Sequence, residues 1–200
     1  MPKVPRRQPR QARALATRAA IFEATAQILE SEGEGGFNTN RVAERAGVSI
    51  GTLYQYFGSK QAILAAMARE WNAHNREVLA VQIAEGAASP VRLAIRNQIH
   101  AMPGRPETRR AALKAIMAEE GVSGIKRETY ATTRLLPPME RFDAFVLDRA
   151  VSGVIRAAVL EGSAHLADPR LEDALVRLVE AYQQAAKKRA APNQSRPVAE

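Results

Sequence analysis

Residues 37–60 read FNTNRVAERAGVSIGTLYQYFGSK, and their pattern predicts local structure more clearly than any other part of the chain. Thr39 is a suitable N-cap for a short helix that starts at the next residue. Gly47 can adopt a positive φ without a Cβ clash, so it permits a sharp turn after that helix. Ser49 can then cap a second short helix. A short helix, a glycine-containing turn and a second helix together predict a helix-turn-helix.

The second of these short helices is expected to have a buried face and an exposed face. Leu53 and Phe57 are four residues apart, so they lie on one side of a helix and are expected to point inward. At 100° per residue, Gly51 and Gln55 then point away from the core. Because Gly51 has no side chain, the exposed face stays thin and its backbone can approach the floor of a DNA groove.

Polar side chains along this face are suited to DNA. Hydroxyl and ammonium groups can donate hydrogen bonds to phosphates, whereas Gln55 can pair with an adenine edge. The alternative for Tyr54 and Tyr56 is that they are core residues, as Phe57 is expected to be. The candidate DNA contacts are Thr39, Arg41, Ser49, Ile50, Gly51, Thr52, Tyr54, Gln55, Tyr56 and Lys60.

Charge favours the same class of partner. The 200-residue chain has a formal net charge of +8. Its first 18 residues hold six basic residues and no acid. Such a patch suits a polyanion, of which nucleic acid is the usual example, although a solvated disordered tail has the same composition. Cysteine is absent, which excludes disulfides, thiol nucleophiles and cysteine metal sites.

Apolar periodicity predicts helices throughout the rest of the chain, and no alternating strand pattern is present. The expected fold is therefore all-α, with a three-helix N-terminal helix-turn-helix domain and about six further helices. We expect a flexible basic arm (1–12), a DNA-binding domain (13–60), a ligand-binding and dimerisation domain (61–189) and a disordered tail (190–200). Helices are expected at 13–32, 60–85, 90–102, 107–120, 125–136, 142–160 and 171–188, with Gly33 and Gly121 among the residues that end them.

Residues 18–64 closely resemble the N-terminal domain of TetR/AcrR-type regulators. The matching strings are RAAIFEATAQILESEG and TNRVAERAGVSIGTLYQYF, followed by Lys60 and Ile63-Leu64. The departures are small: Gln61 stands where the family usually has an acid, and Gly58-Ser59 replaces a more usual polar pair. The resemblance implies a three-helix DNA head with residues 50–57 in the major groove. It also implies a divergent C-terminal domain that binds a small ligand and dimerises through its last two helices.

Methionine and aromatic residues of the C-terminal half are ambiguous. Such residues line adaptable apolar pockets, but for any single one of them a place in a simple core is the more common outcome. Trp71 and Phe142 are preferred because the cavity of the family lies between the equivalent helices. The candidate ligand residues are Met67, Trp71, His100, Met117 and Phe142.

The last two long helices have apolar faces broader than one neighbour can cover. An intermolecular four-helix bundle would bury both faces, and the alternative is that they only cover the core of their own chain. The candidate dimer residues are Val151, Val154, Ile155, Ala158, Leu175, Leu178 and Tyr182.

The sequence gives little support to an enzymatic or metal-binding function. Gly47–Gly51 spells G-x-S-x-G, the string of a hydrolase nucleophile elbow, but a charged helix precedes it where that elbow needs a buried strand. The three histidines are scattered singly, and no phosphate-binding loop is present. We therefore expect no enzyme activity, cofactor or metal. No apolar run approaches the roughly 20 residues that span a bilayer.

Together these features predict a cytoplasmic homodimer that binds a near-palindromic operator in double-stranded DNA. We expect a repressor that a small-molecule effector of unknown identity releases from that operator, and no membrane partner. The alternative is a helical ligand-binding or scaffold protein that does not bind DNA.

Overall fold

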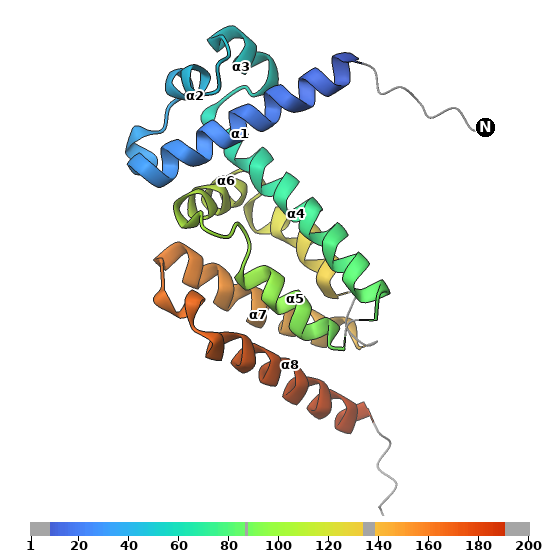
Figure 1. The fold of residues 1–200 in the computed structure, drawn as a ribbon. Coiled ribbons are helices and arrows are strands. Elements are labelled where there is room, and N and C mark those ends of the chain that lie inside the picture. The colour runs from blue at the N-terminus through green and yellow to red at the C-terminus, as the bar shows by residue number, and fades with distance from the viewer. Residues whose placement is uncertain (1–8, 87, 134–138, 191–200) are drawn as a thin grey trace, which may run out of the picture. The chain divides into compact units, whose positions relative to one another are not determined.

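The computed structural model describes the backbone of residues 9–86, 88–133 and 139–190, and the side chains of residues 11–86, 88–119 and 139–189. Within these ranges every regular element is a helix, which confirms the all-α fold (Figure 1). The elements are α1 (Pro9–Gly36), α2 (Thr39–Arg45), α3 (Ile50–Tyr56), α4 (Lys60–Ala84), α5 (Pro90–Ile99), α6 (Pro106–Thr133), α7 (Arg141–Glu161), a short 3-10 helix (Ala164–Ala167) and α8 (Pro169–Ala190).

The chain forms two compact units. Unit 1 comprises Met1–Asn72 and Met102–Gly124, and unit 2 comprises Ala73–Ala101 and Ile125–Glu200. Unit 1 therefore contains α1, α2 and α3 together with the first part of α4 and much of α6. Unit 2 contains α5, α7 and α8. No helix in the described part of the chain is long and apolar enough to cross a bilayer.

Several helix boundaries differ from expectation, and the helix expected at 90–102 already ends at Ile99. Helix α1 begins at Pro9, inside the segment expected to be a flexible arm. Gly33 has φ 67° and ψ −170°, so the regular helix breaks there as expected, although a further turn follows it. Gly121 was expected to end a helix, but α6 continues through it to Thr133. A glycine costs a helix interior roughly 1 kcal/mol without blocking its hydrogen bonds, so this prediction was wrong. The last residues of the helix expected at 125–136 lie outside the described ranges.

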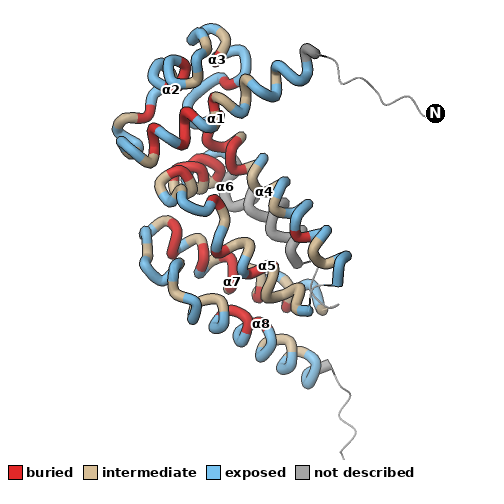
Figure 2. Tube along the Cα trace, viewed as in Figure 1, coloured by how far each residue is buried: buried red, intermediate tan, exposed pale blue. Residues whose placement is uncertain are grey.

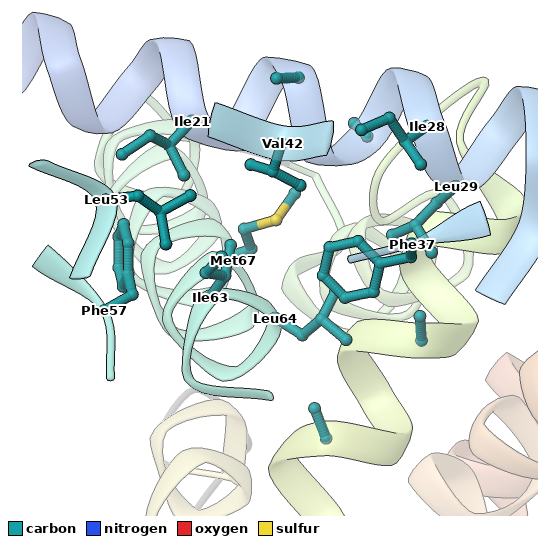
Figure 3. Close-up of a cluster of buried hydrophobic side chains, with 14 of the residues drawn as sticks. Ile21, Ile28, Leu29, Phe37, Val42, Leu53, Phe57, Ile63, Leu64 and Met67 are labelled. Carbon is teal, nitrogen blue, oxygen red and sulfur yellow. The ribbon is translucent and has the colours of Figure 1, made fainter. Parts of the chain in front are cut away.

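The core of unit 1 gathers side chains from five helices (Figure 3). Ile21 and Ile28 of α1 are fully buried, as their helical spacing predicts. Leu53 of α3 and Ile63 of α4 are also 0% exposed. Burying an aliphatic side chain contributes about 1.5–3 kcal/mol, so this cluster is the main force that holds α2 and α3 against α1 and α4.

A carboxylate on α1 caps the start of α6. Glu30 accepts hydrogen bonds from the backbone N–H of Thr108 at 2.8 Å and from its Oγ1 at 2.7 Å. The first N–H groups of a helix have no partner within the helix, and a negative charge there is favourable. An ion pair between Lys114 and Glu34 (2.7 Å) joins the same two helices, and Arg105, just before α6, pairs with Glu23 of α1 at 2.8 Å. Helix α6 is thereby fixed against α1 within unit 1.

Unit 2 packs α5, α7 and α8 against one another. Leu147 and Ile155 of α7 and Val179 of α8 are at most 4% exposed. At the edge of this packing, Arg92 and Arg96 of α5 both bind Glu172 of α8, at 2.9 and 2.8 Å. These hydrogen bonds, that of Arg96 above all, lower the pKa of Glu172 to about 2.

Candidate nucleic-acid interface

Local capping defines the two short helices of the helix-turn-helix. The Asn38 side chain accepts from the Arg41 backbone N–H at 3.0 Å, so Asn38 is the N-cap of α2. The prediction of Thr39 was wrong by one residue, because asparagine caps as well as threonine and lies one position earlier. Gly47 has φ 67°, which confirms its role in the turn. Ser49 accepts from the Thr52 N–H at 3.0 Å and caps α3, as expected.

The inner side of the motif is anchored in the core of unit 1. Val42 and Leu53 are 0% exposed, and Phe57 is 6% exposed. All three point into the cluster beneath α1 (Figure 3). Val48 at the corner also packs against this cluster. The predicted inward residues are thus confirmed, and α3 is held through Leu53 in its middle and Phe57 at its end.

The outer side of α3 faces solvent (Figure 2). Tyr54 is 51% exposed, Ile50 39% and Tyr56 37%. The interpretation of the two tyrosines as core residues is therefore wrong. Gly51 and Gln55 are exposed beside them. A Cβ built on Gly51 meets only Ser49 Oγ, at 3.8 Å, so the folded chain has room for a side chain at that position.

Hydroxyl groups on α2 and α3 lie next to one another. Thr39 Oγ1 and Tyr54 Oη are 3.2 Å apart, and either can donate to the other. Ser49 Oγ and Thr52 Oγ1 are 2.8 Å apart. Each hydroxyl can donate one hydrogen bond and accept two, so these pairs keep capacity for a further partner. The sequence placed these residues on one surface but did not predict the bond between the helices.

The two predicted cationic contacts, Arg41 and Lys60, have different surroundings. Arg41 forms a two-point ion pair with Glu32 of α1, in which its Nη2 donates to Oε1 at 2.7 Å. Arg45 lies 3.9 Å from the same carboxylate. A phosphate must therefore compete with Glu32 for Arg41. Lys60, at the start of α4, is exposed and holds its ammonium 5.8 Å from the centroid of the Phe37 ring.

The G-x-S-x-G string has a structural explanation. Its serine is the N-cap of α3, and the turn after α2 precedes it where a nucleophile elbow needs a strand. The Ser49 hydroxyl accepts a backbone N–H and contacts Thr52. This arrangement is that of a helix start and not of a nucleophile.

Residues 21–67 match the family model described as bacterial regulatory proteins, tetR family. The match covers the last half of α1, the two short helices and the beginning of α4. Residues 21–67 are thus similar to the N-terminal domain of TetR-family regulators. A curated relative, the HTH-type transcriptional regulator BetI 1 of Chromohalobacter salexigens, is 30% identical over 106 residues. That alignment covers 53% of this chain and 52% of the relative, so the chain matches about half the length of that protein.

Solved TetR-type structures share the fold over most of the chain. The Thermus thermophilus repressor FadR, in complex with lauroyl-CoA, is 15% identical with a TM-score of 0.61, covering 92% of this chain and 99% of that one. The Bacillus subtilis FadR, with stearoyl-CoA, is 18% identical with a TM-score of 0.61 and coverages of 82% and 96%. A regulator from a Rhodococcus species is 23% identical with a TM-score of 0.55 and coverages of 86% and 98%.

The candidate ligand residues are divided between the two units of the chain. In unit 1, Met67 is buried in the core, Met117 is half-buried and Trp71 packs against Met102 and its neighbours. In unit 2, His100 caps the end of α5 and is exposed, and Phe142 at the start of α7 is 67% exposed. Within unit 2, therefore, neither His100 nor Phe142 is buried.

The candidate dimer residues fall into two groups. Four of them are at most 8% exposed, so they pack mainly within their own chain. These four are Val151, Ile155, Ala158 and Leu175, and their burial is what the alternative of core packing predicts. Val154 and Leu178 are 45% and 40% exposed, and Tyr182 is half-buried with its hydroxyl donating to Asp143 at 2.9 Å.

Proposed function

We propose that this chain is a dimeric transcriptional regulator that binds a near-palindromic DNA operator through α3 and leaves it when an effector binds. One observation carries the proposal: α3 is fixed in the core by Leu53 while its opposite side presents Gly51, Tyr54 and Gln55 to solvent. A thin, polar helix face that is rigidly supported suits the major groove. The expected compartment is the cytoplasm, where the chromosome of a bacterium lies.

Two kinds of contact are assigned to this surface. The Thr39 and Tyr54 hydroxyls lie 3.2 Å apart, and whichever of them accepts the bond between them keeps its own O–H to donate to a phosphate. Lys60 adds a positive charge. Such contacts give affinity and its salt dependence. Gln55 and Thr52, nearest to Gly51, contact base edges and supply sequence preference. Arg41 reaches a phosphate only when it leaves Glu32.

The dimer is proposed to form through α7 and α8. Val154 on α7 and Leu178 on α8 are exposed apolar residues. The exposed alanines 157, 174 and 181 share these two helices and allow close helix approach. Two copies related by a two-fold axis would form a four-helix bundle and place two copies of α3 on successive major grooves.

Regulation by an effector is the third part of the proposal. Two structures of this fold contain acyl-CoA molecules, which supports the presence of an effector site in this chain. An effector acts by binding more tightly to a conformation in which the two α3 helices do not fit the operator. The ratio of its affinities for the two conformations sets how far it shifts the protein away from the DNA-bound conformation.

A selection from a random duplex library, followed by fluorescence anisotropy on the selected sequence, tests DNA binding. Tyr54→Ala is expected to weaken binding more than tenfold, which is about 1.4 kcal/mol. The reason is that it removes a phosphate donor without disturbing the core. Tyr54→Phe removes only the hydroxyl and is expected to have a smaller effect. Val81→Ala, a truncation at a 56% exposed position of α4, is the control and is expected to change nothing.

Salt dependence separates this proposal from a helical ligand-binding or scaffold protein without DNA binding. The logarithm of the affinity is expected to fall linearly as the logarithm of the salt concentration rises, because phosphate contacts release counterions. An affinity that does not change with salt, or no enriched sequence in the selection, would favour the scaffold function.

A further inference from the structure

Trp71, the single tryptophan of the sequence, has a buried indole N–H donor. It lies on α4 and packs against Ala68, Met102, Ala112 and Ile116 of unit 1. Its Nε1 is fully buried and finds no hydrogen-bond partner in the described part of the chain. An unpaired buried N–H costs about 1–3 kcal/mol, and a buried group of this kind is rare in folded proteins. The chain therefore keeps an unfavourable polar atom in an apolar cluster.

Met102, in the same cluster, has a strained backbone. Its φ is 53°, and among residues 9–86, 88–133 and 139–190 no other non-glycine residue has a positive φ. The left-handed conformation costs an L-residue roughly 1–2 kcal/mol. The Met102 side chain is nevertheless buried, at 9% exposure. Two local costs in one small cluster are characteristic of a ligand-binding site, where the bound molecule offsets them.

A cation lies on the same side of α6 as this cluster. Arg109 precedes Ala112 by three residues and Ile116 by seven, so helical spacing puts all three side chains on one face. Burial lowers the pKa of the Arg109 guanidinium to about 10, so it stays charged at neutral pH in surroundings of low polarity. An anion is attracted more strongly there than in water.

We propose that Trp71, Met102 and Arg109 form the effector site, and that its ligand is an amphipathic carboxylate. The apolar part of the ligand packs against Ala112 and Ile116, and a carboxylate oxygen accepts the Trp71 N–H. Because this N–H is covered in the structure, a neighbouring side chain must move, and Met102 moves as its backbone leaves the strained conformation. The inference rests on the proposed function, since it identifies the effector of that regulator.

Titration of the full-length protein with decanoate tests the site, and the fluorescence of Trp71 reports binding directly. Decanoate is expected to bind saturably and at least ten times more tightly than decyltrimethylammonium, which has the same chain with the opposite charge. 1-Decanol, the neutral analogue, is expected to bind with intermediate affinity. Equal affinities for the three compounds, or no saturable binding of decanoate, would overturn the proposal.

Replacing Trp71 with β-(3-benzothienyl)alanine isolates the hydrogen bond, because sulfur takes the place of the N–H in a ring of the same shape. Calorimetry is expected to show decanoate binding weakened at least fivefold, while the melting temperature without ligand stays the same or rises. Unchanged decanoate affinity would disprove the role of the N–H. Arg109→Gln is expected to weaken decanoate binding tenfold and to leave 1-decanol binding unchanged. Equal losses for both ligands would contradict the role of the charge.

Val81→Ala serves as the control and is expected to bind all three compounds as the wild type does. Operator binding is measured on the same samples. If the operator binds and decanoate does not, this inference fails alone. If the operator does not bind, the proposed function fails, whatever the result with decanoate.

Discussion

The helix-turn-helix and the α7–α8 pair present opposite kinds of surface. Helix α3 has seven residues, and the fully buried Leu53 is followed at once by Tyr54, which is 51% exposed. Helices α7 and α8 have 21 and 22 residues, and their exposed faces carry Val154, Leu178 and small residues. A polar face over a narrow anchor suits a charged polymer, whereas a long apolar face suits another apolar face. The difference supports the proposal that the first surface binds DNA and the other binds a second copy of the chain.

The largest expected effect is at the anchor of α3. Leu53→Ala is expected to lower the free energy of unfolding by about 3 kcal/mol, because it leaves a cavity in the core of unit 1. Urea denaturation followed by circular dichroism measures this loss. Tyr54→Ala, one residue away, is expected to change stability by less than about 0.5 kcal/mol. Similar losses for the two variants would mean that α3 has no distinct inner and outer faces.

The next effect concerns the apolar surface. Leu178→Glu places a charge on the proposed dimer face and is expected to weaken the dimer about a hundredfold, or about 2.7 kcal/mol. Analytical ultracentrifugation measures the dissociation constant. Val81→Glu, the same kind of change at a 56% exposed position of α4, is expected to leave it unchanged. A Leu178→Glu protein that remains dimeric at low concentration would exclude this face from the interface.

The helix-turn-helix was predictable because its signals are local. Gly47 and Ser49 act on residues within three or four positions of themselves, so the turn and the start of α3 follow from the sequence. Helical spacing likewise placed Leu53 inside. The bond between Thr39 and Tyr54 was missed, because 15 residues separate them and two helices must first pack together.

The sequence predicted that α7 and α8 are helices, but it did not predict which side of each helix faces the core of its own chain. Apolar spacing cannot distinguish a residue that covers its own core from one that meets a partner. Ile155 and Ala158 are buried in this chain, while Val154 beside them is exposed. Their burial depends on packing against α5 and α8. The capping of α6 by Glu30 is equally non-local, since 78 residues separate that carboxylate from Thr108.

A pH-dependent effect is expected where α5 meets α8. The folded-state pKa of Glu172 is about 2, below its ordinary value of 4.5, because Arg96 and Arg92 donate hydrogen bonds to it. A depressed pKa means that the ionised carboxylate stabilises the fold fully above pH 4.5, and that this contribution is lost as the pH falls towards 2.

Glu172→Gln is therefore expected to cost about 1 kcal/mol at pH 7, a value kept small because both arginines are partly exposed to solvent. Urea unfolding at pH 7 and pH 3 is expected to show that the difference between variant and wild type shrinks at the lower pH. Glu85→Gln makes the same charge change at an exposed position and serves as the control. A difference that is constant with pH would mean that the ion pairs do not stabilise unit 2.

The smallest effect is the most specific test of the polar surface. Gly51 lies inside α3, where glycine is roughly 0.5–1 kcal/mol less favourable than alanine, and a Cβ there meets only Ser49 Oγ, at 3.8 Å. Gly51→Ala is therefore expected to raise the free energy of unfolding by that amount and to weaken operator binding about fivefold. The two effects have opposite signs. The absence of a side chain at Gly51 does not stabilise the folded chain, but it lets the helix backbone approach the bases. Urea denaturation and fluorescence anisotropy measure them on one sample. A stabilised variant that binds the operator as tightly as the wild type would show that α3 does not enter the groove closely at this residue.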